Sequence, residues 1–144
     1  MEFIKIDHTT SQDILIKKDD IADFLVKHLG QYGDKKEDIL KCIEYVLNPN
    51  KGGLILIAAE KNSFNGIAIL NKTGMSDYIP ENILVYIAVH ENQRGKGLGR
   101  MIMQKIIEET EGNIALHVEA DNPAKKLYER LGFSNKYLEM RLTR

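Results

Sequence analysis

The chain has 144 residues, of which 43% are hydrophobic and 28% are charged. This length and composition predict one compact domain over residues 1–144 and exclude a disordered chain. Twenty basic and 21 acidic residues give a net charge of −1, so no global field attracts nucleic acid or an anionic membrane.

Cysteine and histidine usage excludes several further classes of protein. Cys42 is the only cysteine, so neither an internal disulfide nor a cysteine-based metal cluster can form, and its place on an apolar stripe predicts a core residue. The histidines share no metal-ligand spacing, and we expect no metal. No apolar stretch reaches the roughly 18 residues of a membrane span. Because Met1-Glu2-Phe3 begins no signal peptide either, we expect a cytoplasmic protein without membrane or nucleic-acid partners.

The first 30 residues predict a strand followed by a helix. Phe3–Asp7 is a short run typical of a strand. Apolar residues then recur with helical spacing behind a Ser11 N-cap, and Gly30 closes the helix. The apolar positions are Ile14, Ile21, Phe24, Leu25 and Leu29.

A second helix and a hairpin come next. Asp34-x-x-Glu37 resembles a capping box at the start of the helix, and Asn48-Pro49 stops it. Gly53–Glu60 and Gly66–Asn71 are apolar, β-rich runs on either side of the polar turn Lys61–Asn65. This pattern predicts two antiparallel strands joined as a hairpin.

The second half of the chain alternates strands and helices. Ile83–Val89 has no polar alternation, which predicts a central strand covered on both faces. A third helix runs from Leu98 until Gly112 ends it, Ile114–Val118 is a strand, and a fourth helix lies between Pro123 and Gly132. Residues 133–142 are expected to form one or two closing strands. The order βααβββαβαβ predicts a mixed α/β sheet in a single domain.

The segment between the central strand and the third helix, residues 94–100, reads Arg94-Gly95-Lys96-Gly97-Leu98-Gly99-Arg100. Unpaired backbone N–H groups at a helix N-terminus attract anions, and glycines let a ligand approach the backbone closely. A diphosphate is the anion that best fills several N–H groups at once. The three cations add positive charge, so we predict a diphosphate-binding turn.

Two other phosphate motifs were compared with this turn. The P-loop pattern is missing. The dinucleotide fingerprint Gly-x-Gly-x-x-Gly differs by one residue, because the third glycine here is Gly99. Glu119 lies about 20 residues further on, where a ribose-binding acid is found, but too few residues follow Asp121 for the remaining units of a doubly wound sheet. Nucleotide binding stays as an alternative.

Two segments resemble the GNAT superfamily of N-acetyltransferases. Arg94-x-x-Gly97-x-Gly99 matches the family signature Gln/Arg-x-x-Gly-x-Gly/Ala. Residues 124–133 are similar to the family's Ala-x-x-Leu-Tyr-Glu-x-x-Gly-Phe segment, and the resemblance is strong from Ile83 to Phe133. It implies an α+β fold with a mixed, mostly antiparallel central sheet flanked by about four helices. It also implies transfer of an acetyl group from acetyl-CoA, as co-substrate, to a primary amine of a small molecule or peptide by direct attack on the thioester.

The resemblance assigns the cofactor-binding residues. The backbone of Ile87, Ala88 and Val89 is expected to pair with the pantetheine arm, where the two central strands splay apart. Asn122 is a further candidate ligand, although the family's Asn-x-x-Ala register places Asp121 at the first position, and either residue also suits the N-cap of the fourth helix. The pyrophosphate is expected on Arg94, Gly95, Lys96, Gly97, Leu98, Gly99 and Arg100.

The catalytic assignment centres on Tyr128, which by resemblance protonates the departing CoA sulfur. The alternative is that its ring packs on a buried helix face with its hydroxyl merely satisfied. The central strand contains no Asp, Glu or His, so Glu81 before it and His117 on the neighbouring strand are candidate bases, and ordered water can replace either.

A non-catalytic acyl-CoA sensor or interaction module remains the alternative function. The loops at residues 30–36 and 72–82 are expected near the acceptor, and the protein is expected to be a monomer or a homodimer.

Overall fold

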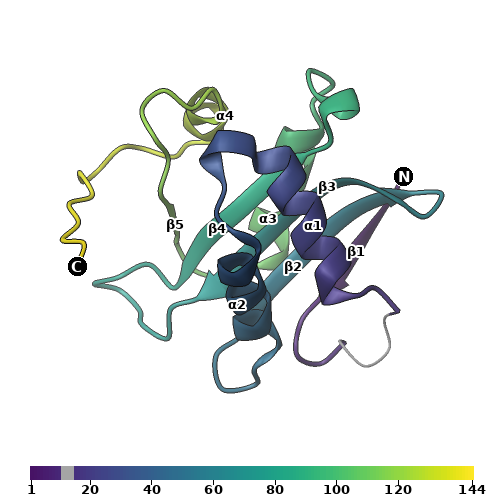
Figure 1. The fold of residues 1–144 in the computed structure, drawn as a ribbon. Helices are drawn as coiled ribbons and strands as arrows, with labels where there is room; N and C mark the ends of the chain where they lie inside the picture. Colours follow the sequence, from purple (N-terminus) through teal and green to yellow (C-terminus); the bar gives the residue numbers. More distant parts are fainter. Residues whose placement is uncertain (11–14) are drawn as a thin grey trace.

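The computed structural model describes residues 1–10 and 15–144. Its elements alternate between a sheet and the helices that cover it (Figure 1). They are β1 (Glu2–Ile6), α1 (Lys18–Leu29), η1 (Gly30–Tyr32), α2 (Lys36–Leu47), β2 (Gly53–Glu60), β3 (Ser63–Lys72), β4 (Asn82–Val89), η2 (Glu91–Gln93), α3 (Leu98–Glu109), β5 (Ile114–Leu116) and α4 (Ala124–Arg130).

The sheet has five strands in the order β1-β2-β3-β4-β5. The first four strands pair antiparallel, and β5 joins β4 in parallel. A parallel neighbour needs a crossover connection, which α3 supplies. The predicted fold, a mixed and mostly antiparallel sheet flanked by helices, is therefore confirmed.

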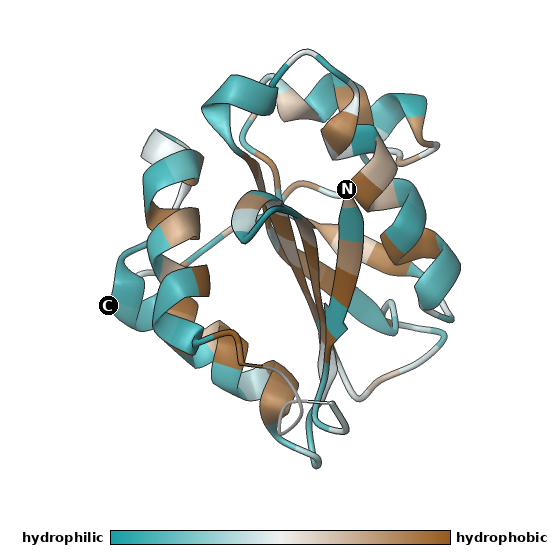
Figure 2. Cartoon of the chain, turned by 90° about the vertical axis from the view of Figure 1, so that its right-hand side faces the viewer, coloured by the Kyte–Doolittle hydropathy of each residue, from teal (hydrophilic) through white to brown (hydrophobic). Residues whose placement is uncertain are grey.

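Helices cover both faces of the sheet, which Figure 2 shows between two helical layers. One buried cluster joins α1 and α2 to one face, and a second joins α3 and α4 to the other. The middle strands are buried on both sides, which explains why β2 and β3 lack the polar alternation of a half-exposed strand. Cys42 lies in the first cluster, as predicted, and burial raises the pKa of its thiol to about 12.

A β-bulge in β4 decides which of its side chains face α3 and which face α1. Tyr86 is paired with Ile69 and Leu84 with Leu70, so Val85 has no partner on β3. The extra residue reverses the alternation of the strand. Leu84 packs on the α3 side, whereas Tyr86 packs on the α1 side.

β4 and β5 separate soon after they begin. Their pairing covers Asn82–Leu84 of β4 and Ile114–Leu116 of β5. In the described part of the chain, no strand pairs with the outer edge of β4 from Val85 to Val89. The backbone groups on this edge are thus open to a ligand, apart from the Val89 carbonyl, which accepts a hydrogen bond from Arg94.

The structure differs from the sequence predictions at several points. Asp34 does not cap α2, because the N-cap is Lys35 and no side-chain cap bond forms there. The predicted closing strands are not formed, since residues 133–144 have no regular secondary structure. The predicted hairpin is present, but its turn is shorter, with Lys61 and Asn62 at positive φ of 50° and 65°. The N-cap of α1 is Lys17 rather than the predicted Ser11. Ser11 and Ile14 themselves lie outside the described residues.

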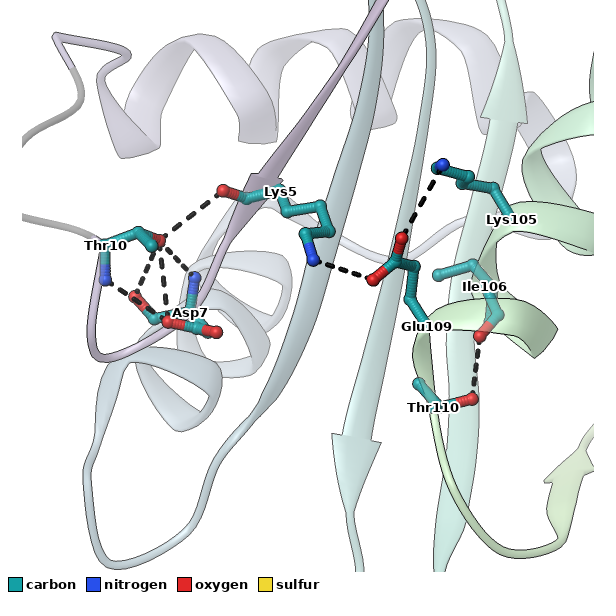
Figure 3. A network of polar contacts seen from close by, with 7 residues as sticks. All are labelled: Lys5, Asp7, Thr10, Lys105, Ile106, Glu109 and Thr110. Carbon is teal, nitrogen blue, oxygen red and sulfur yellow. Dashed lines mark hydrogen bonds and ion pairs between the residues drawn. The ribbon is translucent and has the colours of Figure 1, made fainter.

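Polar contacts attach the end of α3 to β1 (Figure 3). The Glu109 carboxylate accepts a hydrogen bond from Lys5 at 2.7 Å and pairs with Lys105 at 3.6 Å. The Thr110 hydroxyl donates to the Ile106 carbonyl at 2.7 Å. Exposed ion pairs contribute little stability, so these contacts mainly orient the helix whose opposite end carries the glycine turn.

No helix among the described residues is long and apolar enough to cross a bilayer.

Candidate active site

A cleft of about 530 Å³ opens between the end of α1, the end of β4, the start of α3 and α4. Its lining residues come from three separate stretches of the sequence, at residues 27–32, 87–99 and 122–128. Of the predicted site residues it is lined by Ile87, Ala88, Val89, Arg94, Gly99, Asn122 and Tyr128. From α1 and η1 it adds Lys27, His28, Leu29, Gly30, Gln31 and Tyr32.

The β4 wall of the cleft is the open edge of the strand. Ile87 and Val89 pack toward α3 and α4, and Ala88 packs toward α1. Since no described strand pairs with the β5-facing edge of β4 beyond Leu84, an extended ligand arm can bond to the backbone there as an added strand does. The predicted pantetheine site therefore has the right kind of surface.

The glycine turn presents the N-terminus of α3. Gly95 and Gly97 have φ of 76° and 81°, a backbone conformation that residues other than glycine rarely adopt. Gly97 is the N-cap, and its carbonyl accepts the first helical bond, from the Met101 N–H at 3.1 Å. The backbone N–H groups of Leu98, Gly99 and Arg100, in the first turn of α3, have no partner within the helix and can bind an anion.

The side chains of the predicted turn differ in burial and in whether they line the cleft. The Leu98 side chain is buried in the core beneath α3. The side chains of Lys96 and Arg100 are exposed and do not line the cleft. They add positive charge around the turn. Gly95 and Gly97 do not line the cleft either, so Arg94 and Gly99 are the members of the turn that do.

Arg94 connects the glycine turn to α1 and β4 by hydrogen bonds. Its Nη2 donates to the His28 carbonyl at 2.8 Å, and its Nε donates to the Val89 carbonyl at 3.3 Å. A guanidinium group has five N–H donors, so donors remain for an anion. Arg94 thus joins α1, β4 and the turn in one wall of the cleft.

Tyr128 lies on α4 and is 7% exposed. Its ring packs edge-on against Phe133 at 5.9 Å, and burial raises the pKa of its phenol to about 12. No described residue hydrogen-bonds the hydroxyl, although the residue lines the cleft. The ring therefore packs in the core, as expected if Tyr128 has a packing role. The side chain also borders the cleft, where its phenol is protonated.

Asn122 lines the cleft, and the preceding residue Asp121 contacts η1. The Asn122 side-chain oxygen accepts a hydrogen bond from the Ala124 N–H at 2.9 Å, which stabilises the first turn of α4. The Asp121 carbonyl accepts a hydrogen bond from the Tyr32 hydroxyl at 3.3 Å. This contact joins η1 to the loop before α4.

The two candidate bases lie outside the cleft lining. The Glu81 carboxylate accepts hydrogen bonds from the backbone N–H groups of Asn113 (2.7 Å) and Asp77 (3.0 Å), which lower its pKa. It sits before β4, at the opposite end of the strand from Ile87–Val89. His117 is exposed beyond β5.

Sequence reasoning missed the α1 wall. His28 is buried, and its ring lies 4.3 Å from that of His90 and 4.5 Å from that of Phe24. Burial, and then the neighbouring His90, lower its pKa. Helical spacing places His28 four residues after Phe24, on the buried stripe, and that spacing is the signal that points to it.

A second missed feature is the pair formed by Tyr86 and Asp34. The Tyr86 hydroxyl donates to Asp34 Oδ2 at 2.6 Å. Burial, and then this hydrogen bond, raise the pKa of the phenol. The pair attaches the start of α2 to β4 just before the cleft residues.

Comparisons with known proteins agree with this geometry. The family model described as "Acetyltransferase (GNAT) domain" matches residues 51–135. A probable acetyltransferase of solved structure has a TM-score of 0.70 and 22% identity over 100% of this chain and 98% of its own. An aminoglycoside N-acetyltransferase in complex with CoA has a TM-score of 0.70 and 14% identity over 99% and 93%.

Two further relatives have more specific descriptions. Ribosomal-protein-alanine N-acetyltransferase from Brucella melitensis has a TM-score of 0.65 and 14% identity, with 99% of this chain and 98% of that one covered. Mycothiol acetyltransferase of Corynebacterium aurimucosum is 45% identical over 53 residues, which span 33% of this chain and 17% of the relative. The family match covers more than half of the chain, and with it the β4 edge, the glycine turn and α4. The chain belongs to the GNAT family of acetyltransferases.

Proposed function

We propose that this acetyltransferase moves the acetyl group of acetyl-CoA to a primary amine of a small molecule or peptide, by direct attack of the amine on the thioester. The observation that carries the proposal is the single cleft that joins the open β4 edge, the glycine turn and Tyr128. One surface thus offers sites for an extended arm, a diphosphate and a proton donor.

The residues present suit acetyl-CoA as co-substrate. The backbone of Ile87, Ala88 and Val89 would hold the pantetheine arm, and the turn at residues 94–100 would hold the pyrophosphate. Gly95 and Gly97 supply the positive φ that turns their N–H groups outward. Asn122 would contact the same ligand from the α4 side. The ligand supplies an activated acetyl thioester.

Tyr128 acts as the general acid in this proposal. As the amine nitrogen bonds to the acetyl carbon, the carbon–sulfur bond breaks and the phenolic proton passes to the sulfur. The phenol is protonated at neutral pH because its pKa is about 12. Proton donation of this kind contributes about 10²–10⁴-fold to rate.

The amine must lose its own proton before or during attack, since an alkylammonium has a pKa of about 10.4 in water. β4 carries no carboxylate or histidine, whereas His28 of α1 and Glu91 of η2 line the cleft. In our proposal ordered water takes this proton. Positioning of the two reactants supplies the larger share of the rate, about 7–11 kcal/mol.

The amine class is inferred from the α1 and η1 wall and from the names of relatives. Gln31 and Tyr32 offer polar side chains at the cleft opposite α4. Relatives of this fold are named for an aminoglycoside and for a ribosomal-protein alanine as acceptors. Both kinds of acceptor carry a primary amine, and we propose the same class here.

The test is a panel of small-molecule and peptide amines incubated with acetyl-CoA, with release of free thiol as the readout. We expect amine-dependent thiol release, and a higher KM for acetyl-CoA in Arg94→Ala. Lys61→Ala, in the β2–β3 turn outside the cleft lining, is the matched control. If CoA binds but no amine is acetylated, the protein is an acyl-CoA sensor or interaction module instead.

A further inference from the structure

One carboxylate lies beside the cleft and has no part in the mechanism proposed for Tyr128. Asp34 belongs to the segment between η1 and α2, two residues after Tyr32, which lines the cleft. Figure 1 shows this segment crossing in front of β4, and the Tyr86 hydroxyl donates to Asp34 Oδ2 at 2.6 Å. The carboxylate is therefore held in a defined place next to the central strand.

Tyr86 holds this carboxylate on the α1 side of the sheet. Tyr86 and Ala88 are alternate residues of β4 after the bulge, and both side chains pack toward α1. Ala88 lines the cleft, and the Tyr86 ring is buried two residues before it. Asp34 itself is exposed, at the hydroxyl end of that ring. The carboxylate thus lies beside the cleft, with a tyrosine side chain between it and the β4 backbone.

The charge of Asp34 is not neutralised by the described residues. None of their ion pairs includes Asp34. Lys36 follows it closely in sequence but contacts α1 instead, where its Nζ lies 2.9 Å from Asp23 Oδ1 and 3.6 Å from Asp19 Oδ1. One oxygen of Asp34 receives the phenol, and the other, Oδ1, accepts no hydrogen bond from the described part of the chain. The carboxylate is therefore open to an external cation.

This carboxylate suits a cation other than the reacting amine. A nearby anion favours the protonated form of an amine, and the protonated form cannot attack a thioester. In the proposed function the acyl arm follows the open edge of β4, and the Tyr86 side chain keeps Asp34 away from that backbone. A second ammonium group on the same acceptor loses nothing by staying protonated. Asp34 can hold that group while the first amine reaches the thioester.

We propose that the acceptor carries two cationic groups and that Asp34 binds the one that is not acetylated. This inference rests on the proposed function and adds the class of acceptor, which is a diamine or another molecule with two ammonium groups. Tyr86 is a positioning residue, because its hydroxyl fixes one carboxylate oxygen and leaves Oδ1 for the ammonium. A hydrogen bond between an ammonium and a carboxylate is charge-assisted and gives orientation as well as affinity.

The test compares diaminobutane with aminobutanol, which has the same length and a hydroxyl in place of the second amine. We expect a KM about 10-fold lower for diaminobutane, the effect of a hydrogen bond between charged groups. In Asp34→Asn this difference should disappear. The KM for acetyl-CoA and the melting temperature should stay close to those of the unchanged protein, because the asparagine oxygen still accepts the hydrogen bond from Tyr86.

Glu37→Gln is the matched control. It removes one negative charge from the first turn of α2, three residues after Asp34, and Glu37 receives no hydrogen bond from Tyr86. This variant should keep the preference for diaminobutane. Asp34→Glu retains the charge and should restore part of the preference that Asp34→Asn loses. Equal KM values for the two acceptors in the unchanged protein, or a preference that survives in Asp34→Asn, overturns the proposal.

Calorimetry separates this proposal from acetyl transfer itself. Titration of diaminobutane and of aminobutanol into the CoA-bound protein measures acceptor binding without turnover. We expect diaminobutane to bind about 10-fold more tightly, and Asp34→Asn to bind both alike. If this difference is found but no amine is acetylated, the binding site is supported and the transfer reaction is not. If both compounds are acetylated with equal KM and bind equally, the transfer reaction is supported and the second cation site is excluded.

Discussion

The guanidinium group of Arg94 donates a hydrogen bond to the carbonyl oxygen of His28 at 2.8 Å, across 66 residues of sequence. The same group reaches the Val89 carbonyl at 3.3 Å. One side chain of the signature motif therefore connects α1, the end of β4 and the glycine turn. The resemblance to known acetyltransferases assigned Arg94 to the pyrophosphate, and the structure adds a role in positioning the turn.

Arg94→Lys tests this positioning role. Lysine keeps the positive charge but cannot span both carbonyl groups with a planar fork. We expect a lower melting temperature, since loss of such a hydrogen bond costs about 1 kcal/mol, and a KM for acetyl-CoA raised several-fold. Lys96→Arg is the control, because the Lys96 side chain does not line the cleft. An unchanged melting temperature in Arg94→Lys would show that the two carbonyl contacts add nothing.

Tyr128→Phe tests the general acid. Phenylalanine keeps the edge-on contact with Phe133 and removes the phenolic proton. We expect kcat to fall by about 10²–10⁴-fold at saturating acetyl-CoA, with KM for acetyl-CoA close to that of the unchanged enzyme. Tyr137→Phe, on the exposed C-terminal segment, serves as the control.

The pH dependence gives a second readout for Tyr128. Because burial raises the pKa of its phenol to about 12, the acid stays protonated below that pH, and the rate should show no decline from its deprotonation up to about pH 10. Full activity in Tyr128→Phe would instead assign the residue to packing alone.

The parts of the fold predicted best are those determined by local sequence. Three glycines and a preceding apolar run predicted the turn and the start of α3, because φ values such as the 81° of Gly97 depend on that residue itself. Unbroken apolar runs of strand length likewise predicted β2 and β4. Tyr128 was assigned through a motif, since no spacing rule tells a catalytic tyrosine from one that packs, and its catalytic role stays a prediction.

The parts missed depend on distant residues. Asp34 has the sequence of a capping box, but it accepts a hydrogen bond from Tyr86, 52 residues away, and no local rule finds that partner. The bulge at Val85 follows from the pairing of β3 with β4 and leaves no signal in β4 alone. The closing strands expected over residues 133–142 are absent, because this segment pairs with no other described strand.

Tyr86→Phe tests the contact that attaches α2 to β4. The phenol is buried and donates to Asp34, so its removal should cost about 1 kcal/mol and lower the melting temperature by about 2–4 °C. Asp34→Asn should have a smaller effect, because its side chain is exposed and the amide oxygen still accepts the bond. Tyr78→Phe, an exposed tyrosine before β4, is the control. A larger loss in Asp34→Asn than in Tyr86→Phe would contradict this reading.

Because His28 is buried, we predict that the folded protein loses stability in mild acid. Burial, then His90, holds the pKa of its imidazole below the ordinary 6.5, while Lys27 and Arg94 act in the same direction and Glu91 opposes them. Below pH 6.5 the unfolded chain therefore binds more protons at this position than the folded chain does. Stability is complete above about pH 6.5 and declines as the pH falls toward the folded pKa.

The measurement is the melting temperature between pH 5 and pH 8 for the unchanged protein and for His28→Phe. Phenylalanine keeps the stacking with Phe24 and His90 without a titratable group, so the decline below pH 6.5 should become shallower. His117→Asn, which changes an exposed histidine, should follow the unchanged protein. Parallel profiles for His28→Phe and the unchanged protein would exclude His28 as the source of the acid sensitivity.

Gly97 and Gly99 belong to the same motif but should respond differently to alanine. Gly97 has a φ of 81°, so alanine there is strained by roughly 1–2 kcal/mol although nothing lies within 4 Å of the added Cβ. The strain is relieved by turning the N–H groups of the turn away, which should raise the KM for acetyl-CoA about 5- to 30-fold at unchanged kcat.

Gly99 is inside α3, and its added Cβ would lie 3.4 Å from Leu127 Cδ2 and 3.7 Å from Val89 Cγ2, which are ordinary contacts. Alanine also favours the helix by roughly 0.5–1 kcal/mol over glycine. Gly99→Ala should therefore bind acetyl-CoA nearly as well as the unchanged enzyme and melt at a slightly higher temperature. Equal increases in KM for both variants would show that the ligand needs bare backbone at Gly99 as well, and that φ at Gly97 is not the deciding factor.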